Sequence, residues 1–151
     1  MWFHCHWTPG DPTKYPEETI QSDNSAFNSG ADYVELDLHL SADGELVISH
    51  DDDLFRVTHT HAIVSQNNWE ALSQLTYDNG EHVLSLPQLF EYYQKRPNTK
   101  FILETKIDHS LEPSYELEDK IATTIKNTIW KKSYDPLFFC SQLISFSQNH
   151  P

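Results

Sequence analysis

Two acidic side chains separated by one residue stand out in the first third of the chain. Glu35 and Asp37 share a short segment in which apolar and polar residues alternate. In a β-strand, residues two positions apart point to the same face and lie about 6 to 7 Å apart. Such carboxylates repel one another unless a positive group lies between them, and Mg²⁺ and Ca²⁺ prefer oxygen ligands of this kind. The spacing therefore indicates a divalent-cation site, with a solvated polar strand face as the alternative interpretation.

A third acidic residue repeats this spacing later in the chain. Glu104 and Lys106 lie two residues apart, directly after the apolar segment 101–103. An unpaired glutamate is costly to bury within an apolar strand, so a partner explains its presence better than chance does. That partner is either a metal ion, for which Glu104 would be a third oxygen ligand, or the lysine.

A histidine lies where a short apolar segment ends. His50 and Asp51 stand at the junction of the predicted strand 46–50 and a loop, which is where α/β proteins usually place their chemistry. A histidine exchanges protons near neutral pH, as cleavage of a phosphodiester or an ester requires. A hydrogen-bonded surface histidine is the alternative for His50, and a solvated turn is the alternative for the acidic run 51–53.

Strands must position these residues, and short apolar segments alternate with helical patterns along the chain. The sequence predicts strands at residues 2–6, 33–40, 46–50, 100–106 and 137–140. It predicts a helix that begins near Glu17 and Glu18 and ends at Gly30, and further helices over 69–75, 86–95 and 117–129. Strands separated by helices favour βαβ units and a parallel sheet, so the predicted fold class is α/β.

The segment 33–40 has the clearest strand pattern. One side of it carries the apolar residues Val34, Leu36, Leu38 and Leu40, and the other side carries Tyr33, Glu35, Asp37 and His39. Strict alternation of this kind is typical of a strand with one buried face. Both acidic residues therefore share the polar side of this strand.

The charge of the chain limits its partners. The 151 residues include 10 Lys and Arg against 23 Asp and Glu, which gives a net charge of −13. This balance argues against nucleic acid or an anionic membrane as a broad electrostatic partner, whereas a local metal cation would still permit a phosphate substrate. No apolar run is long enough to span a membrane, and the N-terminus does not resemble a secretory signal. With two cysteines far apart in sequence, we expect free thiols and a cytoplasmic location, with a single disulfide as the alternative.

In their order along the chain, these motifs resemble those of the glycerophosphodiester phosphodiesterase family. The family pattern runs from His-Arg-Gly through Pro-Glu-Asn-Thr, Glu-x-Asp, Asp-Gly and His-Asp to Glu-x-Lys. The corresponding stretches here are His6-Trp7-Thr8, Pro16-Glu17-Glu18-Thr19, Glu35-Leu36-Asp37, Asp43-Gly44, His50-Asp51 and Glu104-Thr105-Lys106. The segment Leu54-Phe55-Arg56-Val57-Thr58 also resembles the family segment after His-Asp. The resemblance covers residues 3–106, about two thirds of the chain.

The resemblance implies a TIM-type (βα)₈ barrel whose site lies at the carboxyl ends of its strands. It also implies that Glu35, Asp37 and Glu104 bind one divalent cation, either Mg²⁺ or Ca²⁺. The substrate would be a glycerophosphodiester, which is hydrolysed to glycerol phosphate and an alcohol. The cation would polarise a phosphoryl oxygen.

The same resemblance assigns roles to the histidines and to two charged residues. It makes His6 and His50 the acid and base, one activating the nucleophile and the other protonating the leaving alcohol. Lys106 would help to hold the phosphate, and Glu17 would also contribute to substrate binding. His4 shares a face of the first predicted strand with His6 and is the alternative first-strand histidine.

Three departures from the family pattern define the alternatives. Trp7 replaces the arginine after the first histidine, and Glu18 replaces the asparagine of Pro-Glu-Asn-Thr. The chain is also short, because a barrel of this type needs about 250 residues. We therefore expect one domain, 1–151, with the first five βα units and without the C-terminal part of the barrel, and self-association through an uncovered barrel edge. The alternatives to hydrolysis of glycerophosphodiesters are a catalytically impaired domain that binds metal or phosphodiester, and a phospholipase D-like enzyme of the sphingomyelinase D type.

Overall fold

The computed structural model describes residues 7–96, 99–106, 116–129 and 140–141, which form one sheet and the helices packed on it. In chain order the elements are β1 (Trp7–Thr8), α1 (Ile20–Asn28), β2 (Tyr33–Leu40), β3 (Leu46–Ile48), α2 (Phe55–Thr58), the 3₁₀ helix η1 (Val64–Gln66), α3 (Trp69–Leu72), α4 (Leu86–Tyr93), β4 (Phe101–Thr105), α5 (Glu116–Ile129) and β5 (Cys140–Ser141). The strand predicted at 2–6 lies outside the described residues, and Cys140 is the described residue of the strand predicted at 137–140.

The sheet has the order β1-β2-β4-β5, and these four strands are parallel. This confirms the α/β class. Strand β3 instead pairs with β2 antiparallel, with Leu38 opposite Ile48 and Leu40 opposite Leu46. Residues 41–45 are too short for a parallel crossover, which needs a dozen or more residues. The expected count of five βα units is therefore not confirmed, because the predicted third strand is the second arm of a hairpin.

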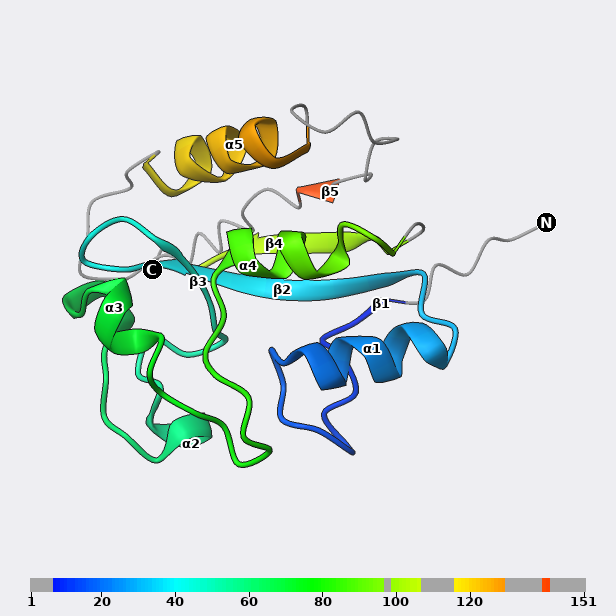
Figure 1. Ribbon diagram of the computed structural model, residues 1–151, viewed down its shortest axis with the longest axis horizontal. Coiled ribbons are helices and arrows are strands. Elements are labelled where there is room, and N and C mark those ends of the chain that lie inside the picture. Colours follow the sequence, from blue (N-terminus) through cyan, green and yellow to red (C-terminus); the bar gives the residue numbers. More distant parts are fainter. Residues whose placement is uncertain (1–6, 97–98, 107–115, 130–139, 142–151) are drawn as a thin grey trace, which may run out of the picture.

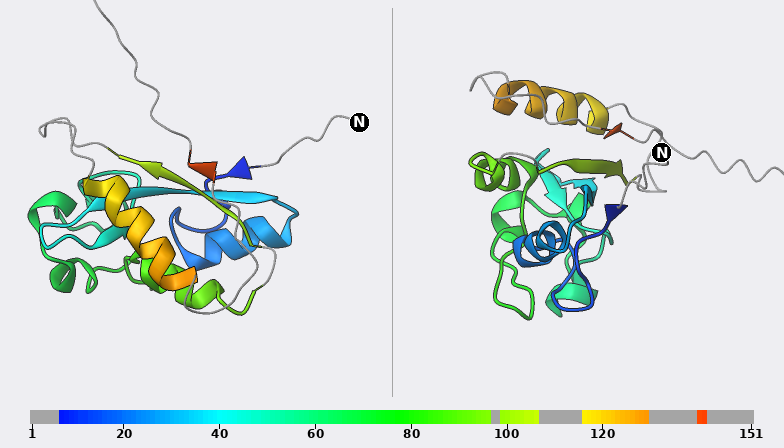
Figure 2. Two further views of the ribbon diagram at one scale, coloured as in Figure 1. Left: turned by 90° about the horizontal axis from the view of Figure 1, so that it is seen from above. Right: turned by 90° about the vertical axis from the view of Figure 1, so that its right-hand side faces the viewer.

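The helices α1, α4 and α5 lie side by side along one face of this sheet (Figures 1 and 2). Helix α4 lies between the other two and contacts α5 directly. Among the described residues, no helix has the length and apolar character needed to cross a membrane.

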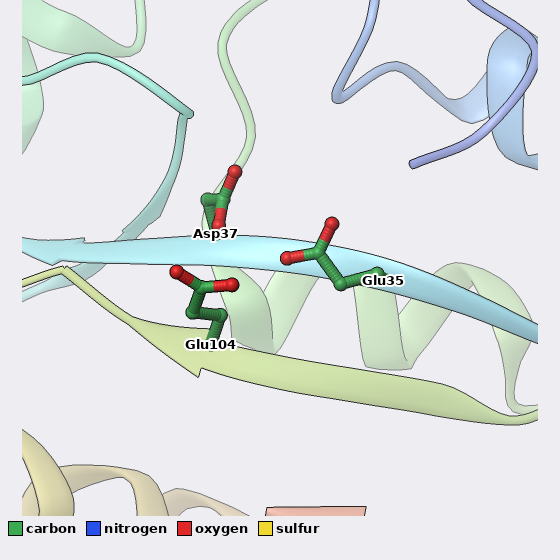
Figure 3. Close-up of side chains that lie close together, drawn as sticks. All are labelled: Glu35, Asp37 and Glu104. Carbon is green, nitrogen blue, oxygen red and sulfur yellow. The ribbon is translucent and has the colours of Figure 1, made fainter. Parts of the chain in front are cut away.

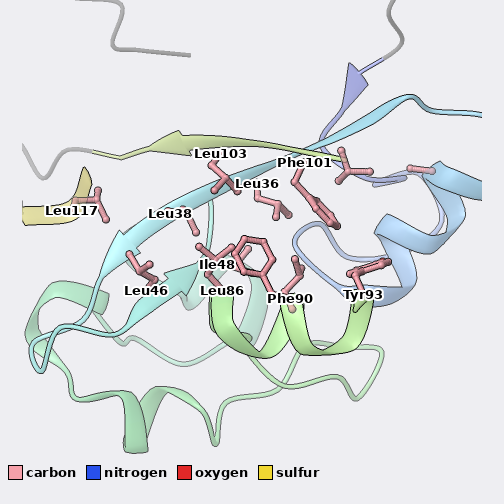
Figure 4. Close-up of a cluster of buried hydrophobic side chains, with 13 residues drawn as sticks. Leu36, Leu38, Leu46, Ile48, Leu86, Phe90, Tyr93, Phe101, Leu103 and Leu117 are labelled. Atoms are coloured by element: carbon pink, nitrogen blue, oxygen red, sulfur yellow. The ribbon is translucent and has the colours of Figure 1, made fainter. Parts of the chain in front are cut away.

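The main hydrophobic core fills the layer between the sheet and these helices (Figure 4). Leu36 and Leu38 of β2 are fully buried in it, as the alternation of the sequence predicts. Phe101 of β4 packs edge to face against Phe27 and Tyr93, with ring centroids 5.6 and 5.1 Å apart. Full burial of each such side chain stabilises the fold by about 2 kcal/mol. Because one face of β2 is fixed here, Glu35 and Asp37 must lie on the opposite face.

A second, smaller core anchors the segment between β3 and α4. Its buried members are Val47, Leu54, Val64, Leu72, Tyr77 and Val83. This cluster ties α2, η1 and α3 to the end of β3, which holds the chain around His50 against the sheet.

Helix α1 begins later than the sequence predicts. Thr19 is its N-cap residue and accepts a hydrogen bond from the Ser22 amide at 3.2 Å. Carboxylate oxygens of Glu81 accept hydrogen bonds from the amides of Ile20 and Gln21 at 2.9 and 3.1 Å. The acidic group that meets the positive end of the helix therefore comes from a distant loop, and not from Glu17 or Glu18.

Candidate active site

Three carboxylates converge on the sheet face opposite the helices, as Figure 3 shows. Glu35 and Asp37 are two residues apart on β2, and Glu104 lies directly opposite Asp37 on β4. One carboxylate oxygen of each residue lies within 4.8 Å of the others. Asp37 is buried, Glu35 is half-buried and Glu104 is exposed, so the cluster opens to solvent on the side of β4.

Lys106 supplies the positive charge that this cluster needs. Its Nζ lies 2.9 Å from Asp37 Oδ1 and 2.7 Å from Glu104 Oε1. Its backbone amide donates to Leu38 O at 2.9 Å, which keeps the end of β4 paired to β2. Burial acts to lower the pKa of Lys106, but its hydrogen bonds to Glu104 and Asp37 raise that pKa to about 12. Lys106 is therefore a permanent cation at this site.

One ammonium does not neutralise three carboxylates. Burial, followed by the negative charge of Asp37, raises the pKa of Glu35 to about 8. A hard divalent cation would remove this repulsion, and the donor set consists entirely of carboxylate oxygens, which suits Mg²⁺ or Ca²⁺. The residues present therefore fit a single divalent cation.

The end of β3 brings His50 to the same end of β2. The Ser49 amide donates to Asp37 O at 3.0 Å, so the chain that leads into His50 is attached beside the carboxylate cluster. The His50 ring is exposed, and its Nδ1 lies 2.8 Å from Asp51 Oδ1. Asp51 therefore engages Nδ1 of the ring, with Nε2 on the other side of the ring.

Arg56 is a site residue to which the sequence analysis gives no role. Its Nε donates to Asp51 Oδ2 at 2.5 Å, and its Nη2 pairs with Glu17 Oε1. Burial acts to raise the pKa of Asp51, but hydrogen bonds from His50 and Arg56 lower it overall. Glu17, predicted to bind substrate, is therefore the far end of a chain of contacts that runs through Arg56 and Asp51 to His50. The sequence signal for Arg56 was the resemblance of the segment 54–58 to the family segment after His-Asp.

His39 is a second residue near the site without a predicted role. It lies two residues after Asp37 on the same face of β2 and is 7% exposed. Its Nε2 is 3.3 Å from the carbonyl oxygen of His50, and its Nδ1 is 3.9 Å from Asp52 Oδ1. Burial lowers its pKa, and the ring contacts the backbone at His50. The alternation of β2 already placed it on the side of Glu35 and Asp37.

The two candidate histidines of the first predicted strand, His6 and His4, lie outside the described residues. Trp7, which follows His6, is in β1 and pairs with Tyr33 of β2. The described structure thus brings together Glu35, Asp37, Glu104 and Lys106, with His50 and Glu17 linked through Arg56.

Comparisons of the sequence with known proteins point to one family. The family model described as the glycerophosphoryl diester phosphodiesterase family matches residues 10–150. A glycerophosphodiester phosphodiesterase of Caldanaerobacter subterraneus is 30% identical over 121 residues, covering 78% of this chain and 50% of that protein. The mouse protein lysophospholipase D GDPD3 is 28% identical over 133 residues, covering 76% of this chain and 38% of its own length.

Solved structures share the fold. A phosphodiesterase of Oleispira antarctica, in complex with the product sn-glycerol-3-phosphate, is 28% identical with a TM-score of 0.72, covering 90% of this chain and 57% of that one. A glycerophosphodiester phosphodiesterase of Thermotoga maritima is 27% identical with a TM-score of 0.67, covering 85% of this chain and 53% of that one. The chain spans about half the length of the first curated relatives that it matches. Since the family model matches nearly the whole sequence, the chain belongs to the glycerophosphoryl diester phosphodiesterase family.

Proposed function

We propose that this chain provides the cation site and a catalytic histidine for the hydrolysis of glycerophosphodiesters to glycerol phosphate and an alcohol. The observation that carries the proposal is the convergence of Glu35, Asp37 and Glu104 with Lys106 on one sheet face. The relative of Oleispira antarctica was solved with sn-glycerol-3-phosphate as its product, which supports this product class. The cofactor would be one divalent cation, Mg²⁺ or Ca²⁺, held by the three carboxylates.

Each residue has a chemical role in this proposal. A bound divalent cation would supply Lewis acidity at a phosphoryl oxygen. The Lys106 ammonium, already at the cluster, would hold a second anionic oxygen and oppose the negative charge of the site. Water adds to phosphorus as the bond to the leaving alcohol oxygen breaks. Of His50 and His6, one accepts the proton of the water and the other gives a proton to the alkoxide. His4 is the alternative to His6.

We also propose that the parallel strands belong to a TIM-type barrel, with residues 1–151 in one glycerophosphodiester phosphodiesterase-like domain. Support comes from solved family members, half or slightly more of whose length matches this chain. Among the described residues, β1 pairs only with β2 and β5 only with β4, which leaves one edge of each strand available. Self-association through such an edge is part of the proposal.

A domain that binds the phosphodiester without cleaving it is the second candidate function. It is favoured by Trp7 in β1, at the position where the family pattern has an arginine that would hold phosphate with two hydrogen bonds. A lipid-cleaving activity of the phospholipase D type is the third candidate, because the mouse relative is named a lysophospholipase D.

One experiment separates these candidates. The chain is incubated with glycerophosphocholine, and in parallel with lysophosphatidylcholine micelles, in Mg²⁺ or Ca²⁺ and then in excess EDTA. We expect release of glycerol phosphate from glycerophosphocholine, loss of that release in EDTA, and strong loss in Glu35→Gln and His50→Gln. Turnover that persists in EDTA would contradict the cation requirement. Binding of glycerophosphocholine by calorimetry without any product would favour the second candidate, and cleavage confined to the micelles would favour the third.

A further inference from the structure

The chain that carries His50 leaves the sheet directly after β3. The ladder between β3 and β2 ends where Ile48 lies opposite Leu38. Beyond it, the Ser49 amide still donates to Asp37 O at 3.0 Å, and none of the described strands includes His50. The backbone that presents this histidine therefore depends for its position on contacts other than strand pairing.

A side chain of β2 supplies such a contact. His39 lies on the same face of the strand as Asp37 and is 7% exposed, so its ring needs a hydrogen-bond partner. Its Nε2 lies 3.3 Å from the carbonyl oxygen of His50. Because a carbonyl oxygen only accepts hydrogen bonds, Nε2 is the nitrogen that carries the proton and donates. The His39 ring thus ties the main chain at His50 to the polar face of β2.

The other side of the ring faces the next part of the same loop. Nδ1 of His39 lies 3.9 Å from Asp52 Oδ1, which is too far for a direct hydrogen bond. The Asp52 carboxylate instead accepts from the amide and the hydroxyl of Ser65, both at 3.2 Å, which joins the loop to η1. The segment 50–52 therefore passes over the ring, and within the described structure the ring donates its hydrogen bond at His50.

We propose that His39 is a positioning residue for catalysis, because its Nε2–H holds the carbonyl of His50 and so sets the place of the His50 ring beside the carboxylate cluster. The inference rests on the proposed hydrolysis of glycerophosphodiesters, in which His50 transfers a proton, and adds a residue that acts through His50. A proton-transfer group must lie within hydrogen-bond reach of the reacting atoms. A small displacement of the loop therefore lowers the rate of reaction more than the binding of substrate.

Three substitutions in the full 151-residue chain isolate this contact. The amide nitrogen of a glutamine lies the same number of bonds from Cα as Nε2 of a histidine, so His39→Gln keeps a donor for the His50 carbonyl. The amide nitrogen of an asparagine lies closer to Cα and corresponds to Nδ1, so His39→Asn loses that donor and stays polar. His39→Leu removes every hydrogen bond and keeps a side chain of comparable bulk.

Steady-state kinetics with glycerophosphocholine, in saturating Mg²⁺ or Ca²⁺, measures the effect on catalysis. We expect kcat to fall about tenfold in His39→Asn and His39→Leu with little change in KM, and to stay within about twofold of the wild type in His39→Gln. His82→Asn is the matched control, because it removes an exposed imidazole in the loop before α4 and should leave both constants unchanged.

Two kinetic results would overturn the inference. Equal losses of kcat in His39→Gln and His39→Leu would do so, because a role in packing alone does not depend on a donor at the place of Nε2. A wild-type kcat in His39→Leu would do so as well, because the position of His50 would then not depend on the contact.

Amide hydrogen exchange tests the contact independently of activity. The Ser49 amide, at the end of β3, should exchange about tenfold faster in His39→Asn and His39→Leu and at the wild-type rate in His39→Gln. Unchanged exchange in all three variants would contradict the anchoring of this segment by His39. If the expected exchange pattern is found and the wild type releases no glycerol phosphate, the proposed function fails and the hold of His39 on His50 stands.

Discussion

The positive charge of Lys106 stabilises the carboxylate cluster when no divalent cation is bound. Its Nζ contacts both Asp37 and Glu104, and Asp37 is almost fully buried. Removing one partner of a buried pair leaves an uncompensated charge, which costs several kcal/mol, less where the pair is partly solvated. Lys106 is a quarter exposed, so the cost here is the smaller one.

We therefore predict that Lys106→Met lowers the free energy of unfolding in EDTA by about 2 kcal/mol. Saturating Mg²⁺ should then raise the Tm of the variant more than that of the wild type, because the cation replaces the missing positive charge. Thermal unfolding with and without Mg²⁺ measures both effects, with the exposed Lys95→Met as control. An equal Mg²⁺-induced shift in variant and wild type would contradict the prediction.

Arg56 is linked to His50 through Asp51, which contacts both side chains. In Arg56→Gln, the Asp51 carboxylate loses the partner that fixes its orientation, so the His50 ring is held less firmly. We predict that kcat falls about tenfold while KM changes little, since a misplaced proton-transfer group affects the transition state more than ground-state binding. Steady-state kinetics with glycerophosphocholine measures this. A change confined to KM would instead assign Arg56 to substrate binding.

At the scale of single residues, the sequence predicts which carboxylates lie together, but it does not predict the contacts that support them. The two-residue period of a strand brings Glu35 and Asp37 to one face, and parallel register brings Glu104 opposite Asp37. Arg56 and Glu17, which form an ion pair, are 39 residues apart in sequence. Glu81 accepts a hydrogen bond from the Ile20 amide at the start of α1, 61 residues earlier. Contacts of this kind depend on how loops are arranged in space, which no local pattern encodes.

At the scale of elements, the first loop depends on a close approach to α1. Gly10 has a φ of +83°, and a Cβ at this position would lie 2.3 Å from the Ser22 Oγ. The same hydroxyl accepts a hydrogen bond from the Asp11 amide at 2.7 Å. An alanine at position 10 would therefore force apart the loop and the buried start of α1.

We predict that Gly10→Ala lowers the free energy of unfolding by about 2 to 4 kcal/mol, through backbone strain and overpacking together. Gly44→Ala is the matched control, because Gly44 has a φ of +80° and a Cβ added there would meet nothing within 4 Å. The backbone strain alone should cost only about 1 kcal/mol in that variant. Denaturant unfolding measures both. Equal losses in the two variants would show that the contact with Ser22 is unimportant.

Asp23 in α1 gives the fold a pH dependence. It is 1% exposed, and in the described part of the chain neither carboxylate oxygen has a hydrogen-bond partner. Burial, followed by the charge of Glu81, raises its pKa to about 8. The folded chain keeps a proton that the unfolded chain releases near pH 4, so stability falls as the pH rises from about 4 to 8.

We predict that Asp23→Asn gains stability over the wild type, with a gain that grows across this window to about 1 to 3 kcal/mol at pH 8. Thermal unfolding at pH 5 and pH 8 measures the difference. A gain that is the same at both pH values would mean that the proton on Asp23 does not contribute.

The hairpin of β2 and β3 shows why the fold was predicted only in part. The strand predicted from the alternation in 33–40 and the helix predicted over 117–129 are both confirmed. The strand after Asp43-Gly44, which the alternation of strands and helices places in a parallel sheet, is instead antiparallel to β2. The length of residues 41–45 was the available signal, because it permits a hairpin and no crossover.

At the scale of the whole molecule, the sheet edges bear on the proposed self-association. The described edges at β1 and β5 present backbone groups that pair with no other described strand. We predict that the purified chain forms dimers or larger assemblies, because an open parallel edge is a template for pairing. Size-exclusion chromatography with light scattering, over a hundredfold range of concentration, measures this. A monomer at every concentration would contradict the prediction.

The chain has a net charge of −13, and the carboxylates of Glu35, Asp37 and Glu104 gather on one sheet face. The proposed chemistry depends most on the binding of a cation by this cluster. The most direct test is an anomalous difference map from crystals of the chain grown with Mn²⁺, which accepts the same oxygen ligands as Mg²⁺. We predict one strong peak between the carboxylates of Glu35, Asp37 and Glu104. A crystal saturated with Mn²⁺ that shows no peak there, or a peak held by other residues, would contradict the central claim.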